Sequence, residues 1–304
     1  MKLIRSLNNL KLTEPLCLTI GNFDGFHLGH QKIISNIKSH CAKHNYKSAI
    51  LSFEPHPYSF FKKENNKKFR ISSISQKLQF VKDSNIDYAI ILPFNSNLSQ
   101  ISANNFINEI LVNKLNTKHI IIGYDFVFGK NRSGNINTLI DNSFNRYIVK
   151  QINVINKNNE ICSSSNIRQN IISGKIDIAN NLLNKYFTIN SRIISGQKIA
   201  RKIGYKTANF RVPLNIIKPK YGVYHTKTFI YKLNKEYNSI TNFGIKPTIN
   251  DNCHEICETH IPNFDSDIYN FKISTKFIKF IREEKKFSNI EKLKEQISVD
   301  LSYI

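Results

Sequence analysis

The sequence lacks tryptophan, and methionine, proline and glycine are scarce: 1, 8 and 11 of 304 residues, respectively. It contains no run of about 18 apolar residues, which argues against a membrane-spanning helix. The first 17 residues carry basic side chains but no continuous apolar stretch, so we expect no secretory signal. Disorder is not expected either, because 40% hydrophobic and 11% aromatic residues are typical of a folded protein.

Cysteine is also rare, and its pattern indicates the redox compartment. The five cysteines are odd in number and mostly isolated, so they form no evident disulfide framework. This is typical of a reducing compartment, and we expect a cytoplasmic protein. The cysteines are Cys17, Cys41, Cys162, Cys253 and Cys257.

Acidic residues number only 22 against 44 lysines and arginines, which gives a formal net charge of +22. Such a charge can attract a polyanion. However, lysine is spread along the whole chain, and the densest basic stretch, 61–68, is typical of a polar surface loop. We therefore interpret the charge as compositional drift and expect no nucleic-acid partner. A basic nucleic-acid-binding protein with a degenerate nucleotide fold remains the alternative.

The length allows two domains, and the pattern of the first part is that of an α/β domain. Apolar strands are predicted at Leu16–Ile20, Ser48–Phe53, Tyr88–Leu92 and His119–Gly123. Helical patterns separate them, among them a helix with Ile33, Ile34 and Ile37 on its apolar side and a segment within 101–115. Uniformly apolar strands between helices predict a parallel sheet covered on both faces. Ligands bind such sheets at the carboxyl ends of the strands.

After about Tyr186 the pattern changes to partly alternating β segments, such as Gly222–Ile230 and 271–277. These predict an antiparallel barrel. A closing helix is expected after a capping box formed by Ser288 and Glu291. Its apolar stripe comprises Ile290, Leu293, Ile297 and Leu301. We place the domain boundary at 185/186, which gives domains 1–185 and 186–304.

The first chemical motif follows the opening strand. A glycine turn, 21–25, leads from Ile20 into a helix that starts near His27, Gly29 and His30. A helix N-terminus favours phosphate, and two imidazoles there can donate to its oxygens. Glycine leaves room for a nucleotide to approach. Such a site suits attack on the α-phosphate of ATP by positioning and charge stabilisation. Two surface histidines are the plainer interpretation of the pair alone.

The segment Gly21–Gln31 resembles the nucleotidyltransferase signature of the bifunctional riboflavin kinase/FMN adenylyltransferase family, the prokaryotic FAD synthetases. In this chain Phe53–Pro57 follows the second strand, as the corresponding segment does in that family. The resemblance implies a Rossmann-like nucleotidyltransferase domain in which His27 and His30 are catalytic. It further implies that ATP binds to Gly21, Asn22, Phe23, Asp24, Gly29, Ser163, Ser164, Ser165 and Arg168.

Two further loops belong to this resemblance. Gly123–Gly134 is similar to the family's flavin-contacting loop, and its aromatic and polar side chains suit a planar ring. A glycine-rich surface hairpin is the alternative. The segment 163–168 opens a helix with serines and an arginine, which suits the β- and γ-phosphates. The serines could also be simple N-caps, and Asn166 stands where the family commonly has a basic residue. The implied flavin-binding residues of the first loop are Asp125, Phe126, Phe128 and Arg132.

The C-terminal part resembles riboflavin kinases. Residues 201–209 are similar to the Gly-Phe-Pro-Thr-Ala-Asn motif, and similar pieces follow in family order at 221–224, 242–248, 258–261 and 281–287. The resemblance implies that Thr207 and Asn209 hold Mg²⁺-ATP through side-chain oxygens. Glu258 is implied as the general base for the 5′-hydroxyl of riboflavin, and Arg282 is implied near the flavin.

The kinase motifs also depart from the family pattern. Lys206 replaces the proline before Thr207, Asn270 stands where glycine is usual, and Ala200 stands where glycine is common. Loss of proline should loosen the ATP loop, while the lysine charge can compensate or interfere. We predict a weaker but present kinase activity. Loss of that activity, leaving an FMN adenylyltransferase, is the alternative.

The sequence therefore predicts a bifunctional enzyme that phosphorylates riboflavin to FMN and adenylylates FMN to FAD, with ATP as co-substrate and Mg²⁺ as cofactor. We expect a monomer or weak oligomer. An adenylyltransferase for another phosphate acceptor is disfavoured by the kinase motifs. The spacing of Cys253, Cys257 and His260 could suggest zinc, but no second cysteine pair exists and we expect no metal there. His40 and His44 lie four apart on a predicted helix without an evident third ligand, so we interpret them as surface histidines.

Overall fold

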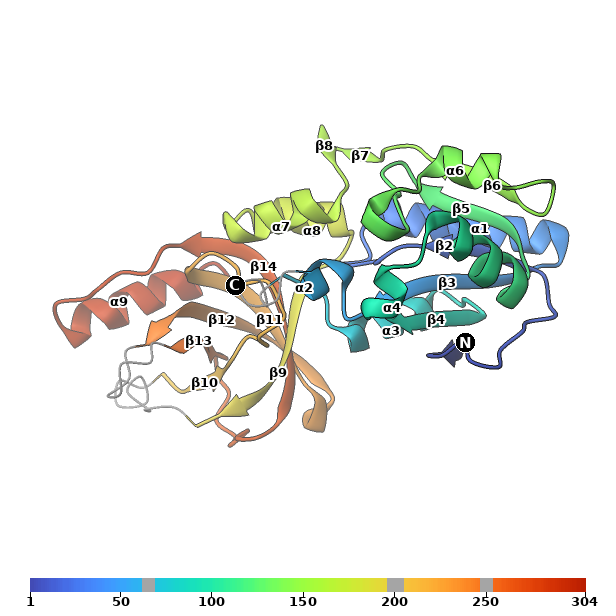
Figure 1. Cartoon of the computed structure of the whole chain (residues 1–304). Coiled ribbons are helices and arrows are strands. Elements are labelled where there is room, and N and C mark those ends of the chain that lie inside the picture. The colour runs from blue at the N-terminus through green and yellow to red at the C-terminus, as the bar shows by residue number, and fades with distance from the viewer. Residues whose placement is uncertain (62–68, 196–204, 247–253) are drawn as a thin grey trace. The chain divides into compact units, whose positions relative to one another are not determined.

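The computed structural model describes residues 1–61, 69–195, 205–246 and 254–304 (Figure 1). The chain divides into two compact units, Met1–Lys67 with Ser72–Ser163, and Lys68–Ile71 with Ser164–Ile304. None of the helices in the described ranges is both long and apolar enough to cross a membrane.

The first unit is built on a six-stranded sheet of order β1-β4-β3-β2-β5-β6, in which every neighbouring pair is parallel. The predicted parallel sheet is confirmed, with β1 and β6 added at its edges. The strands are β1 (Lys2–Ile4), β2 (Leu16–Ile20), β3 (Lys47–Glu54), β4 (Tyr88–Pro93), β5 (Thr117–Gly123) and β6 (Ile148–Ile152), and a small hairpin pairs β7 (Asn156–Lys157) with β8 (Glu160–Ile161).

Helices cover both faces of this sheet. Alternate residues of β2 enter different cores: Leu16 and Leu18 pack on one side, and Cys17 packs on the other beside Ile33 and Ile37. The segment predicted as helical within 101–115 is helical, but most of it is a π-helix. The helices of this unit are α1 (Leu28–His44), α2 (Pro57–Phe61), α3 (Ile74–Asp83), α4 (Ser96–Ser99), α5 (Ala103–Asn105), η1 (Phe106–Lys114), η2 (Lys130–Arg132) and α6 (Ile136–Asp141).

A histidine cluster joins β5 to the end of α1. The ring centroids of His40 and His119 lie 3.6 Å apart, and those of His40 and His44 lie 4.3 Å apart. His119 is buried, and burial lowers its pKa to about 4, helped by the charges of His40, His44 and Lys150. The described residues contain no group of three ligands that could hold a metal.

We predict that this cluster makes the sheet less stable in mild acid. The pKa of His119 is about 4 in the folded chain against an ordinary 6.5, so the unfolded chain binds more protons between these values. Stability is therefore full above pH 6.5 and falls as the pH drops toward 4, by about 2 kcal/mol between pH 7 and 5. Hydrogen exchange of the β5 amides should show this loss in wild type and much less of it in His119→Leu. An equal loss in both proteins would contradict the prediction.

The second unit contains a closed barrel of order β10-β13-β12-β11-β14-β9, with antiparallel neighbours. The predicted antiparallel barrel is confirmed. Its strands are β9 (Phe187–Ile194), β10 (Thr207–Phe210), β11 (Gly222–Ile230), β12 (Lys235–Lys246), β13 (His254–His260) and β14 (Lys272–Arg282), and its helices are α7 (Ser164–Ile172), α8 (Ile176–Leu183), η4 (Tyr231–Leu233) and α9 (Ile290–Leu301).

The closing helix α9 is confirmed, but its predicted capping box is wrong. The N-cap is Asn289, whose side chain accepts from the Lys292 N–H, one residue later than expected. Asparagine caps as well as serine does, so the helix can begin one residue later than predicted. The predicted stripe is half-buried except for Ile290, which is exposed, whereas the buried residue of α9 is Asp300.

Asparagine occupies many left-handed backbone positions. Non-glycine residues rarely adopt positive φ, and asparagine tolerates it better than most. Asn270, in the turn before β14, has φ of 63°. The asparagines with positive φ are Asn9, Asn45, Asn85, Asn116, Asn131, Asn145, Asn158, Asn159, Asn184, Asn234, Asn263 and Asn270.

Candidate active sites

The loop between β2 and α1 is held in one conformation by buried contacts. Phe23 and Phe26 are buried although both have φ of 50°. The Gly25 N–H donates to Ser72 Oγ, and the Ser72 N–H donates to Asp24 Oδ1, each at 3.1 Å. Asp24 therefore turns inward toward Ser72. Sequence reasoning missed Ser72 because this residue lies far along the chain from the loop.

Two histidines follow this loop at the start of α1. His27 is the N-cap residue and is only 6% exposed, yet its side chain makes no capping hydrogen bond. The His27 and His30 rings stack with centroids 3.7 Å apart, and the Phe23 ring lies 4.9 Å from that of His30. The first turn contains no acidic residue that could compete with an anion. The positive end of the helix dipole and both imidazoles thus lie together.

Gly29 serves packing as well as access. A Cβ at this position would lie 3.1 Å from the His27 ring and 3.4 Å from the Cys162 carbonyl oxygen. Glycine therefore lets the imidazole and the residue before the serine segment both approach the helix start. A larger residue here would move His27.

The serine segment begins beside this helix start and then enters α7. Ser163 donates its N–H to the Ile161 carbonyl at 3.0 Å, and α7 begins at Ser164. Ser165 is exposed on the first turn of α7. The Arg168 guanidinium lies 3.7 Å from the centre of the Phe69 ring and donates to the Phe69 carbonyl. The phosphate contacts of this segment stay predictions.

The loop after β5 separates its predicted flavin residues into two groups. Asp125 and Arg132 are exposed, whereas Phe126 is half-buried. Phe128 is buried in the core and stacks on Phe126, with ring centroids 5.4 Å apart. In this structure Phe128 therefore supports the loop from the core, and Phe126 is the more exposed of the two stacked rings. The flavin contacts of all four residues stay predictions.

In the barrel, strand register brings the predicted kinase residues together. Asn209 of β10 lies directly opposite Glu258 of β13, and Thr207 lies opposite His260. Asn242 of β12 lies opposite Glu258 on the other side. Directly opposed residues share one face of a sheet. Glu258 therefore has a carboxamide neighbour on each side.

This polar row lies on the outer face of the barrel. Cys257 and Thr259, which alternate with Glu258, are fully buried, as are their neighbours Phe210 and Phe243. Because strand side chains alternate between faces, Glu258, Asn209 and Asn242 point away from the interior. Glu258 and Asn242 are half-buried there, which is a suitable setting for a ligand.

The oxygens on β10 suit a hard cation. Asn209 is 4% exposed, and its Oδ1 has no hydrogen-bond partner in the described parts of the chain. The Thr207 hydroxyl lies two residues away on the same face. Carboxamide and hydroxyl oxygens are ligands that Mg²⁺ accepts alongside phosphate oxygens. The residues present therefore fit the predicted Mg²⁺-ATP site.

Two of the three departures in the kinase motifs, Lys206 and Asn270, are accommodated. Lys206 Nζ lies 2.5 Å from Asp265 Oδ1, and the Lys206 carbonyl accepts from His260 Nδ1 at 2.8 Å. The lysine charge thus has an acidic partner, although the pair is exposed. Asn270 keeps the left-handed turn that glycine would form, and its N–H donates to the Ile193 carbonyl. Ala200 and residues 201–204, 247, 248 and 253 lie outside the described residues.

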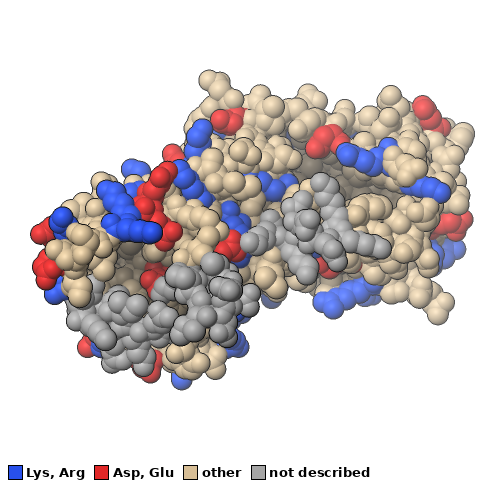
Figure 2. Space-filling model, turned by 60° about the vertical axis from the view of Figure 1, so that its left-hand side comes forward, with Lys and Arg blue, Asp and Glu red and all other residues tan. Residues whose placement is uncertain are grey.

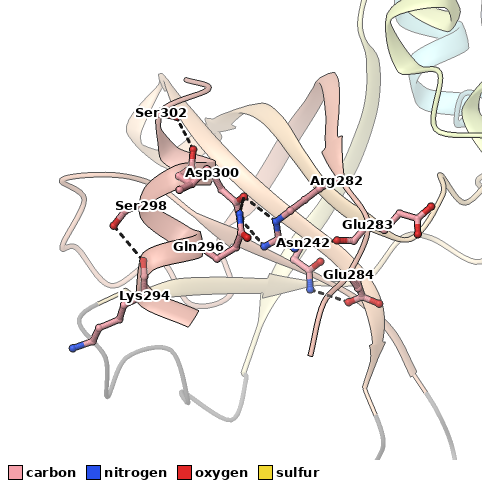
Figure 3. A network of polar contacts seen from close by, with 10 residues as sticks. Asn242, Arg282, Glu283, Glu284, Lys294, Gln296, Ser298, Asp300 and Ser302 are labelled. Carbon is pink, nitrogen blue, oxygen red and sulfur yellow. Dashed lines mark hydrogen bonds and ion pairs between the residues drawn. The ribbon is translucent and has the colours of Figure 1, made fainter. Parts of the chain in front are cut away.

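The Arg282 side chain is held in place by a residue of helix α9. Its guanidinium makes two parallel hydrogen bonds to Asp300, at 2.9 Å and 2.7 Å, as Figure 3 shows. Gln296 also donates to Asp300, at 3.0 Å, and Asp300 is 3% exposed. A bidentate pair of this kind restricts the guanidinium strongly. Its contact with a flavin stays a prediction, but its orientation is set by α9.

Comparison with known proteins covers both units. The family model described as FAD synthetase matches residues 10–166, and the one described as riboflavin kinase matches residues 183–304. A bifunctional riboflavin kinase/FMN adenylyltransferase of Buchnera aphidicola subsp. Schizaphis graminum is 41% identical over 100% of this chain and 98% of its own length. The chain belongs to this bifunctional family.

Other members of the family match over the same span. The bifunctional enzyme of Haemophilus influenzae is 33% identical over 99% of this chain and 97% of its own length, and that of Escherichia coli K12 is 30% identical over 99% and 96%. A Streptococcus pneumoniae crystal structure titled a macrolide-efflux protein has a TM-score of 0.89 at 23% identity and covers 99% of this chain and 97% of that one. At that identity the likeness shows the fold alone.

Proposed function

We propose that this member of the family performs both reactions in the cytoplasm: residues 1–185 adenylylate FMN to FAD, and residues 186–304 phosphorylate riboflavin to FMN. One observation supports the division. Each half assembles its own phosphate-handling group, a histidine pair at a helix N-terminus in one and an amide-flanked carboxylate on a barrel in the other.

In the adenylyltransferase half, an FMN phosphate oxygen attacks the α-phosphorus of ATP, and pyrophosphate leaves. His27 and His30 donate to the phosphate oxygens as negative charge develops on them, and the α1 dipole adds to this stabilisation. Ser163–Ser165 and Arg168 bind the departing phosphates. The rigid loop 21–26 orients the nucleotide, and the loop 123–134 holds the flavin through Phe126, Asp125 and Arg132.

In the kinase half, Glu258 accepts the proton from the riboflavin 5′-hydroxyl as that oxygen attacks the γ-phosphorus of ATP. Thr207 and Asn209, on the neighbouring strand, orient the triphosphate. Thr207 and Asn209 would also hold Mg²⁺, which would supply charge neutralisation to the triphosphate when bound. Arg282, held by Asp300, lies against the flavin.

A time course tests this function. Wild type with riboflavin, ATP and Mg²⁺ should form FMN first and FAD second, as followed by mass spectrometry. With FMN supplied instead, FAD should form without any lag. Addition of EDTA in excess over Mg²⁺ should stop FMN formation, because the triphosphate then lacks its counter-ion. Conversion of FMN to FAD with no FMN ever formed from riboflavin would show that the kinase half is inactive.

An adenylyltransferase with a lost kinase is the second candidate. This candidate is suggested by Lys206 and Asn270, which replace the proline and glycine of the family pattern. However, Lys206 is paired with Asp265, and Asn270 keeps the left-handed turn. We therefore propose a kinase that is weaker than in relatives with proline and glycine at these positions, but present.

We further propose a monomer or weak oligomer without a nucleic-acid partner. On the face in Figure 2, lysines and arginines lie in separate groups, several beside acidic residues. Nucleic-acid binders gather such charge into a continuous patch or stripe. On this face, the distribution supports compositional drift as the origin of the high positive charge.

A further inference from the structure

Asn242 has no role in the mechanism above, although it lies beside the proposed base. The strand order β10-β13-β12 places Glu258 between Asn209 on one side and Asn242 on the other. Directly opposed residues have Cβ atoms about 5 Å apart. The triphosphate belongs on the β10 side of Glu258, with Thr207 and Asn209. The β12 side is therefore the side from which an alcohol can approach the base.

The Asn242 carboxamide is held in one orientation. Its Nδ2 donates to Glu284 Oε1 at 3.0 Å, as Figure 3 shows. Glu284 lies close over Gly244, where an added Cβ would be 1.9 Å from Oε1. Gly244 thus makes room for the carboxylate, and the carboxylate fixes which end of the Asn242 amide is nitrogen. The oxygen end is left for another partner.

That oxygen is buried and has no hydrogen-bond partner within the described residues. A buried carbonyl oxygen without a donor is energetically costly, and such groups are few in folded proteins. A carbonyl oxygen accepts only, so its partner must bring a hydrogen-bond donor or a cation. Since the cation-binding oxygens lie on β10, two strands away, a donor is favoured.

We propose that Asn242 is a substrate-binding residue of the kinase site, whose Oδ1 accepts a hydrogen bond from the 4′-hydroxyl of the riboflavin side chain. This inference rests on the proposed role of Glu258. The carboxylate and the amide oxygen are adjacent acceptors, and the 5′- and 4′-hydroxyls are adjacent donors on the sugar-alcohol chain. The Glu258 carboxylate and the Asn242 oxygen therefore bind two neighbouring hydroxyls of riboflavin. A flavin that lacks the 4′-hydroxyl is bound poorly.

The test is a substrate-by-variant cycle. Initial rates of 5′-phosphate formation are measured by mass spectrometry with riboflavin and with 4′-deoxyriboflavin. Wild type should prefer riboflavin in kcat/KM by about 10- to 100-fold, the equivalent of one unsatisfied buried acceptor. Asn242→Ala should lose most of this preference and raise KM for riboflavin, while KM for ATP and the Mg²⁺ requirement change less than about 2-fold.

Two further variants control the result. Asn238→Ala removes an exposed asparagine from the same face of β12 and should behave as wild type. Asn242→Ser keeps a short acceptor and should recover part of the preference for riboflavin. If the alanine variant does not fold, the Asn242→Ser variant still tests the proposal.

The outcomes are distinguishable. Equal discrimination by wild type and the Asn242 variants would overturn the proposal, and so would a raised Mg²⁺ requirement, which would assign Asn242 to the cation. A wild type that phosphorylates neither flavin would instead refute the kinase function on which the proposal rests.

Discussion

Glu258→Ala should form no detectable FMN from riboflavin, while it still converts added FMN to FAD. General-base catalysis contributes about 10²- to 10⁴-fold, and the neighbouring amides Asn209 and Asn242 cannot accept a proton in its place. We expect kcat for riboflavin to fall by at least about 100-fold with little change in KM for ATP. Mass spectrometry of the riboflavin and FMN reactions measures both activities in one preparation.

Two further variants serve as controls for the Glu258→Ala result. Glu258→Gln keeps the shape of the side chain but not its basicity, so it should be as inactive as alanine. Glu236→Ala removes an exposed carboxylate from barrel strand β12 and should keep kinase activity. If Glu258→Ala makes FMN at the wild-type rate, the base lies elsewhere.

His30→Ala should show the opposite defect, with riboflavin converted to FMN and the reaction stopping there. The imidazole lies at the first turn of α1, where it is packed between His27 and Phe23. Removal of one preorganised donor to developing charge costs about 10²- to 10³-fold. We expect FMN to accumulate and FAD formation to fall by that factor.

His44→Ala is the matched control, since His44 is an exposed histidine at the far end of the same helix. It should leave the FMN-to-FAD rate unchanged. An FMN-forming defect in His30→Ala, with FAD formation intact, would reverse the assignment of the two halves.

Much of the fold could be predicted because it depends on local patterns. The strand Leu16–Ile20 was predicted to the residue, since a uniformly apolar segment before a glycine turn has few other solutions. The apolar side of α1 was predicted from Ile33, Ile34 and Ile37, which are all buried. Likewise, a histidine pair after a strand and a glycine turn can only reach the start of the next helix.

Other features depend on contacts between distant segments and could not be predicted. The register that places Asn242 and Asn209 on either side of Glu258 joins three strands that are far apart in sequence. The burial of Phe128 depends on Phe106 and Gly134, which the loop sequence alone does not reveal. Asp300 has the sequence signature of an ordinary polar helix residue, because its partner Arg282 lies on a different element.

The asparagines in left-handed turns show that many turns of this fold do not require glycine. Where the turn requires only positive φ, as at Asn234 or Asn270, a side chain has room and asparagine has been accepted. Where a Cβ would collide, 2.3 Å from the Arg282 carbonyl at Gly222 or 2.7 Å from Phe128 at Gly134, glycine is present. A positive backbone angle alone therefore still permits asparagine, whereas a close contact at Cβ does not, so Gly222 and Gly134 are positions with little mutational freedom.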